Sequence, residues 1–152
     1  EKELAELRGT IGEWEVVTTF FGSDGTASRT VTGGYRFEWV IKDRVASGSS
    51  WIPELGQRSA LLFYVSPERR AIEMTSVGAD GKLWIMTGPL GDSVRTTAPY
   101  QDPARQQRQL RFTRFNVTPD RFESRMDHTG DNGRTWLRGN HQVFTRRPAD
   151  PR

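Results

Sequence analysis

Turn-forming sequences recur at short intervals along most of the chain. Runs rich in Val, Thr, Phe, Tyr and Trp are interrupted about every 8 to 14 residues by such sequences. Among them are Asp24-Gly25, Asp80-Gly81 and Asn132-Gly133, pairs that adopt the positive φ angles of tight hairpin turns. Neighbouring runs are therefore expected to pair as hairpins in one antiparallel sheet.

The runs predict about ten strands, preceded by one short helix. Leu4 and Leu7 are spaced to share one side of a helical turn, so residues 2–9 are predicted as that helix. Residues 98–106 contain two prolines and no periodicity, which predicts an irregular flap. The strands are expected near residues 12–21, 27–41 with a kink at Gly33-Gly34, 44–52, 58–66, 70–77, 82–88, 92–97, 107–117, 121–129 and 134–146.

The length and the strand content together favour a closed barrel. A chain of 152 residues has room for one domain, so residues 1–152 are assigned to a single domain. Ten strands in sequential order form either a sandwich or a barrel. With almost no helix to cover a sheet face, closure is the better way to remove exposed strand edges. We predict an all-β, single antiparallel up-and-down β-barrel.

Composition excludes several classes of site. The chain has no cysteine, so it forms no disulfide, no thiolate zinc site and no cysteine nucleophile. It has no run of about 18 apolar residues and therefore no membrane-spanning helix. The densest basic stretch includes Arg108 and Arg111, an odd number of positions apart. They point to opposite faces of a strand, so we interpret the arginines between residues 105 and 125 as parts of solvated strand faces and expect no nucleic-acid partner.

Strand alternation suggests that the barrel contains a cavity. In the strand at 121–129, Phe122, Met126 and His128 share one face. In the last strand, one face combines the aromatic Trp136 and Phe144 with three polar residues, Arg138, Asn140 and Gln142. A dry core does not accept this mixture, whereas a ligand cavity combines apolar walls with a few polar groups.

The beginning of the first strand resembles a known family. Gly12-Glu13-Trp14, preceded by a short helix, is similar to the G-x-W opening of lipocalins and their calycin relatives. With residues 35–40 and 131–136, it resembles an uncharacterised bacterial lipocalin-like family, a domain of unknown function. This resemblance implies that Trp14 closes one barrel end and that an arginine of the last strand, Arg138 or Arg146, packs across it. It does not identify a ligand.

The predicted function is binding of a small hydrophobic molecule inside the barrel. Arg138 is either the Trp14 partner or an anchor for a ligand carboxylate. Two alternatives remain open: a small barrel enzyme of the isomerase, cyclase or dehydratase type with His128 or a buried carboxylate as proton carrier, and a filled barrel acting through its surface. The predicted wall residues are Trp39, Trp51, Met74, Trp84, Met86, Phe112, Phe122, Met126, His128, Trp136, Arg138 and Asn140.

Cofactors and compartment are less constrained by the sequence. No cofactor is expected, although His128 has the placement of an axial ligand if the barrel binds haem. His128 and His141 with Asp127 and Asp131 make a poor zinc set, so no metal site is expected.

The chain fits a cytoplasmic location or, after removal of a signal peptide, a periplasmic or secreted one. The oligomeric state is left open.

Overall fold

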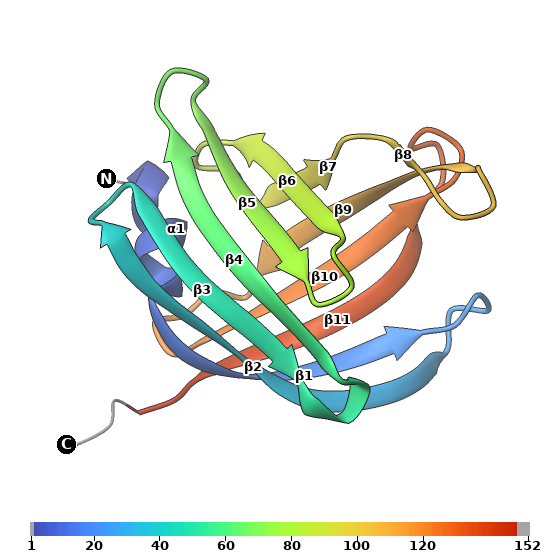
Figure 1. Cartoon of the computed structure of the whole chain (residues 1–152), viewed down its shortest axis with the longest axis horizontal. Helices are drawn as coiled ribbons and strands as arrows, with labels where there is room; N and C mark the ends of the chain where they lie inside the picture. Colours follow the sequence, from blue (N-terminus) through green and yellow to red (C-terminus); the bar gives the residue numbers. More distant parts are fainter. Residues whose placement is uncertain (1, 149–152) are drawn as a thin grey trace.

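The computed structural model describes residues 2–148, and they form one sheet with a short helical segment before it (Figure 1). The helical segment is η1 (Lys2–Leu4) followed by α1 (Ala5–Thr10), and a second single turn, η2 (Pro53–Leu55), joins two strands. The strands are β1 (Gly12–Phe21), β2 (Ala27–Ile41), β3 (Val45–Ile52), β4 (Gln57–Ser66), β5 (Ala71–Gly78), β6 (Leu83–Pro89), β7 (Val94–Thr97), β8 (Tyr100–Gln101), β9 (Gln107–Phe115), β10 (Arg121–Thr129) and β11 (Leu137–Arg146).

The sheet closes into a barrel of ten antiparallel strands. Each strand from β1 to β6 pairs with the next one along the chain, β7 pairs with β9, and β9, β10 and β11 continue the order. The circle closes because β11 pairs with β1, from Trp14 opposite Arg146 to Phe20 opposite Asn140. The prediction of an all-β, antiparallel up-and-down barrel with one short N-terminal helix is confirmed.

Two segments differ from the sequence prediction. The flap expected at residues 98–106 contains the two-residue strand β8, which pairs with the start of β9 outside the main circle. The last strand begins at Leu137 rather than at residue 134. Side-chain hydrogen bonds hold the preceding loop away from the ladder: Asp131 accepts from the Thr135 amide at 2.8 Å, and Thr129 Oγ1 accepts from the Gly133 amide at 3.0 Å.

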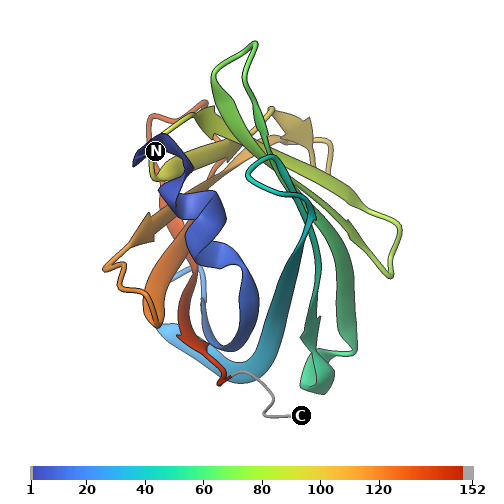
Figure 2. The same cartoon turned by 90° about the vertical axis from the view of Figure 1, so that its left-hand side faces the viewer.

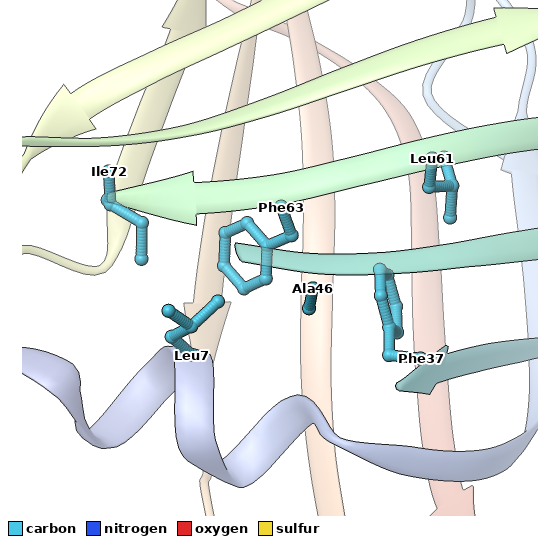
Figure 3. Packing of buried hydrophobic residues seen from close by; sticks show 6 residues of the cluster. All are labelled: Leu7, Phe37, Ala46, Leu61, Phe63 and Ile72. Atoms are coloured by element: carbon cyan, nitrogen blue, oxygen red, sulfur yellow. The ribbon is translucent and has the colours of Figure 1, made fainter. Parts of the chain in front are cut away.

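The helix covers one end of the barrel. Figure 2 shows α1 in front of this end, and we call it the closed end. Leu7 of α1 is fully buried against a hydrophobic cluster that includes Phe37, Phe63 and Ile72 (Figure 3). At the other end, which we call the open end, lie the β1–β2, β3–β4 and β5–β6 connections and the loop before β11. The helix therefore acts as a plug for one end only.

Trp14 is part of this plug, as the G-x-W resemblance predicted. Its side chain is fully buried, and its Nε1 donates a hydrogen bond to the carbonyl of Thr10 at 2.9 Å. The guanidinium of Arg146 lies 4.2 Å from the Trp14 ring centroid, so Arg146 is the arginine that packs across Trp14. Of the two arginines proposed from sequence, Arg138 is not this partner and stacks on Phe21 instead.

The structure also explains why glycine begins the motif. Gly12 has φ = 122°, a conformation that side chains rarely adopt. A Cβ at Gly12 would lie 2.5 Å from Arg146 Nη1. The same Nη1 donates to the Ile11 carbonyl at 2.6 Å, and Nη2 donates to the Gly9 carbonyl at 3.0 Å. Gly12 thus leaves room for the arginine that ties the helix to the last strand.

Candidate functional site

A cavity of about 400 Å³ runs inside the barrel from the closed end to the open end. Its wall is mostly aromatic and sulfur-containing, with a small number of polar groups. Trp14, Phe63 and Phe122 line the half next to α1, where Trp14 bonds to Thr10 and Phe63 packs with Leu7. Trp51, Trp84, Met86 and Met126 line the half next to the open end.

Strand alternation places these side chains on the inner surface. In the β5–β6 pair, Met74 lies opposite Met86 and Ser76 opposite Trp84, and all four line the cavity. The residues next to them along each strand point to the outer face, and two of these, Val77 and Ile85, are exposed. The pairing of Ser76 with Trp84 leaves open space beside the indole, because serine fills little of the wall.

The glycine pair predicted to kink the second strand makes room for Trp51. A Cβ on Gly34 would lie 2.4 Å from Trp51 Cζ2, and one on Gly33 would lie 2.0 Å from the Trp51 carbonyl oxygen. Only glycine allows β3 to approach β2 this closely. The Trp51 indole is therefore held against β2 at the cavity wall.

The structure brings eight of the twelve predicted wall residues together around the cavity. Four of them do not line it: Trp39, His128, Trp136 and Arg138. The eight that do are Trp51, Met74, Trp84, Met86, Phe112, Phe122, Met126 and Asn140.

A register shift in the last strand turns Arg138 outwards, and Trp136 lies before the first residue of that strand. Met126 pairs with Asn140, but the next residue, Asp127, pairs with Arg138, so β11 has one extra residue, Gly139. Such a bulge reverses the facing of every residue beyond it. Arg138 is consequently exposed, and Trp136 stacks on the outward-facing Arg111 with the guanidinium 4.2 Å from its ring.

The other two residues lie beyond the ends of the cavity. Trp39 is half-buried and packs against the Leu7 cluster at the closed end. His128 pairs with the cavity-lining Leu110, yet it is the next-to-last residue of β10 and does not line the cavity. The haem hypothesis required His128 as axial ligand, and the part of the chain that the structure describes contributes no histidine to the cavity lining.

Several polar side chains along the cavity wall are hydrogen-bonded to one another. Gln142 Nε2 donates to Thr18 Oγ1 at 3.0 Å, and Ser124 Oγ donates to Gln142 Oε1 at 3.3 Å. Burial raises the pKa of Tyr35, while hydrogen bonds with Ser50 and Gln142 act in the opposite direction. Gln142, Thr18 and Ser124 thus satisfy one another, whereas Oδ1 of the cavity-lining Asn140, on the same face of β11 as Gln142, is buried without a hydrogen-bond partner.

Three charged residues at the closed end were not predicted. Glu6 of α1, Arg95 of β7 and Arg114 of β9 all line the cavity, and Glu6 forms an ion pair with Arg95. Alternation could have found Arg114, because it is two positions from the cavity-lining Phe112. The sequence analysis instead interpreted the arginines between residues 105 and 125, Arg114 among them, as solvated. No sequence pattern could have predicted that Glu6 and Arg95 line the cavity together, because one lies on a helix and the other on a strand far away in the sequence.

Metal ligands are not clustered in the structure. Among residues 2–148, no three His, Cys, Asp or Glu side chains are grouped so that they could hold a metal ion.

None of the helices in this range has the length and hydrophobicity of a membrane span.

Comparisons with known proteins find structural similarity only. No family model matches the chain, and no curated protein matches it. EF1p2_mFAP2b, solved bound to DFHBI, is similar over 97% of this chain and 100% of its own, with 12% identity and a TM-score of 0.45. A protein of unknown function from the DUF3598 family of Nostoc punctiforme is similar over the same shares, with 10% identity and a TM-score of 0.31. These sequence identities and TM-scores are too low to transfer a function to this chain.

Proposed function

We propose that the protein binds a small, mainly apolar molecule inside the barrel. The cavity is the observation that carries this proposal. Its volume of about 400 Å³ falls in the lower part of the roughly 300–1,000 Å³ range of small-molecule sites. Its walls are aromatic and methionine side chains with a few polar groups, the usual composition of such sites. The volume suits a medium-chain aliphatic or a small aromatic ligand.

The cavity favours this function over the two alternatives. A filled barrel acting through its surface would not contain this much open volume. An enzyme of the kind considered from sequence needs His128 or a buried carboxylate to carry a proton. His128 does not line the cavity, and the cavity-lining carboxylate of Glu6 forms an ion pair with Arg95. The Gly12–Trp14–Arg146 arrangement also supports the proposed kinship with lipocalin-like barrels.

The test is a titration followed by intrinsic tryptophan fluorescence. Trp51 and Trp84 line the cavity, so a ligand that enters it changes their surroundings. Decanol and a small aromatic dye serve as probes. We expect a saturable change in emission with at least one of them. No change with either probe would contradict the proposal.

A pair of variants on one strand locates the binding site. Ser76→Phe places a ring in the cavity beside Trp84 and should weaken probe binding at least tenfold. Val77→Phe is the matched control, because Val77 is 42% exposed on the outer face of the same strand. Trp136→Ala and Arg138→Ala should leave binding unchanged, since neither side chain lines the cavity. Equal effects of Ser76→Phe and Val77→Phe would contradict binding inside the barrel.

A further inference from the structure

Two arginines are buried at the closed end of the cavity. Arg95 is 3% exposed and Arg114 is 8% exposed, although both line the cavity. Arg95 stacks between Phe63 and Phe112, with its guanidinium carbon 5.1 Å and 5.2 Å from the ring centroids. Arg114 stacks on Phe122 at 4.2 Å. The aromatic wall of the cavity thus holds two guanidinium groups in fixed positions.

The charges at this end do not balance. Glu6 forms an ion pair with Arg95 and leaves Arg114 without a carboxylate partner of its own. In the part of the chain that the structure describes, no group accepts a hydrogen bond from the guanidinium of Arg114, and its Nε is buried without a partner. Two guanidinium groups and one carboxylate leave one positive charge uncompensated.

An uncompensated buried charge is unfavourable, and arginine keeps its proton under ordinary conditions. Burial lowers the pKa of Arg114; the charge of Arg95 acts in the same direction, and Glu6 acts against it. Cation–π stacking on Phe122 recovers about 0.5–2 kcal/mol, but it supplies no hydrogen-bond acceptor. A bound anion would supply both the opposite charge and the acceptor.

We propose that Arg114 binds the acid group of the cavity ligand, which is therefore an amphipathic carboxylate. This inference rests on the proposed binding function and specifies its ligand class. A guanidinium binds a carboxylate through two parallel hydrogen bonds. One uncompensated positive charge matches a monocarboxylate. The acid group lies beneath α1, and the apolar tail extends along Met86 and Trp84 towards the open end.

Three probes with the same tail test the inference on the wild-type protein. Calorimetric titration at pH 7.5 compares decanoate, decanol and decylamine, which carry a negative charge, no charge and a positive charge. We expect decanoate to bind at least tenfold more tightly than decanol, and decylamine to bind most weakly. Equal affinities for decanoate and decanol would overturn the inference and leave the proposed function standing. Failure of all three to bind would contradict the proposed function itself.

A variant pair assigns the preference to one residue. Arg114→Met keeps an unbranched apolar side chain and removes the guanidinium with its charge. We expect it to lose the preference for decanoate while its affinity for decanol stays within about twofold. Arg138→Met is the matched control on the outside of the barrel and should retain the preference. An undiminished preference in Arg114→Met would overturn the assignment.

Thermal unfolding provides a second measurement on Arg114→Met. An uncompensated buried charge is costly, so replacing it by an apolar side chain removes an unfavourable contribution to folding. We expect the Tm of Arg114→Met to equal or exceed that of the wild type in the absence of ligand. Added decanoate should raise the Tm of the wild type more than that of the variant. An equal rise in both proteins would contradict the role of Arg114.

Discussion

Replacing Trp14 by Ala removes the largest fully buried side chain of the barrel. The indole contacts Phe122 edge to face, with ring centroids 4.9 Å apart, and the Arg146 guanidinium lies 4.2 Å from the indole ring centroid. Its Nε1 donates to the Thr10 carbonyl at the end of α1. One substitution therefore removes packing, a cation–π contact and the link between the helix and β1.

The expected loss follows from the buried area. A tryptophan side chain buries about 200 Å², which at about 25 cal/mol per Å² corresponds to about 5 kcal/mol. Alanine retains a small part of this area, and the surrounding side chains relax only partly into the cavity. Measured costs for such truncations are about 3–5 kcal/mol. We expect the free energy of unfolding of Trp14→Ala to fall by about 4 kcal/mol.

Urea unfolding followed by circular dichroism measures this change without relying on the altered tryptophan signal. Trp136→Ala is the control, because Trp136 lies outside the barrel against Arg111, and it should cost less than about 1 kcal/mol. A loss below about 1 kcal/mol for Trp14→Ala would show that Trp14 does not plug the barrel end, and the lipocalin-like comparison would lose its main support.

Two further predictions concern backbone conformation and pH. Gly12→Ala should lower the free energy of unfolding by about 1–3 kcal/mol, because the φ of Gly12 is positive and the new Cβ would meet Arg146. Gly25→Ala is the control: Gly25 also has a positive φ, but its Cβ would point into open space, so the free energy of unfolding should fall less in the same urea assay. Burial opposes ionisation of Glu73, but hydrogen bonds from Thr87 and Tyr64 and the charge of Arg69 prevail and lower its pKa. A lowered folded-state pKa stabilises the fold above about pH 4.5, and this stabilisation is lost as the pH falls through the folded-state value. Acid titrations should therefore show a shallower loss of stability in Glu73→Gln than in the wild type; identical slopes would contradict this role.

The strands and their order could be predicted because their signals are local. Hairpin turns such as Asp24-Gly25 and the β-rich runs between them fix neighbouring pairs, and the scarcity of helix favours closure. The facing of side chains was predictable wherever alternation is regular, as for Met126 and Trp84. It failed for Arg138 because Gly139 adds one residue to β11, and a bulge has no reliable signature in a single sequence. It failed for Trp136 because the strand begins only at Leu137, so alternation does not apply to Trp136.

The charged end of the site depends on contacts between distant segments. Glu6 and Arg95 are 89 residues apart, and only the position of α1 across the barrel end brings them together. Arg114 shares the facing of Phe112, but a buried arginine is rare enough that solvation was the natural interpretation. Sequence reasoning could therefore find the apolar walls and not the group that we infer binds the acid.

The most direct test of binding inside the barrel is a crystal structure with a carboxylic acid that carries bromine at the end of its tail. Anomalous scattering locates the bromine independently of the protein density. We expect a single bromine site inside the cavity, near Trp84 and Met86, with the acid group against Arg114. A bromine inside the cavity but next to Arg114 would reverse the orientation and refute the anion site. Bromine sites confined to the outer surface, with the cavity unchanged, would contradict ligand binding in the barrel.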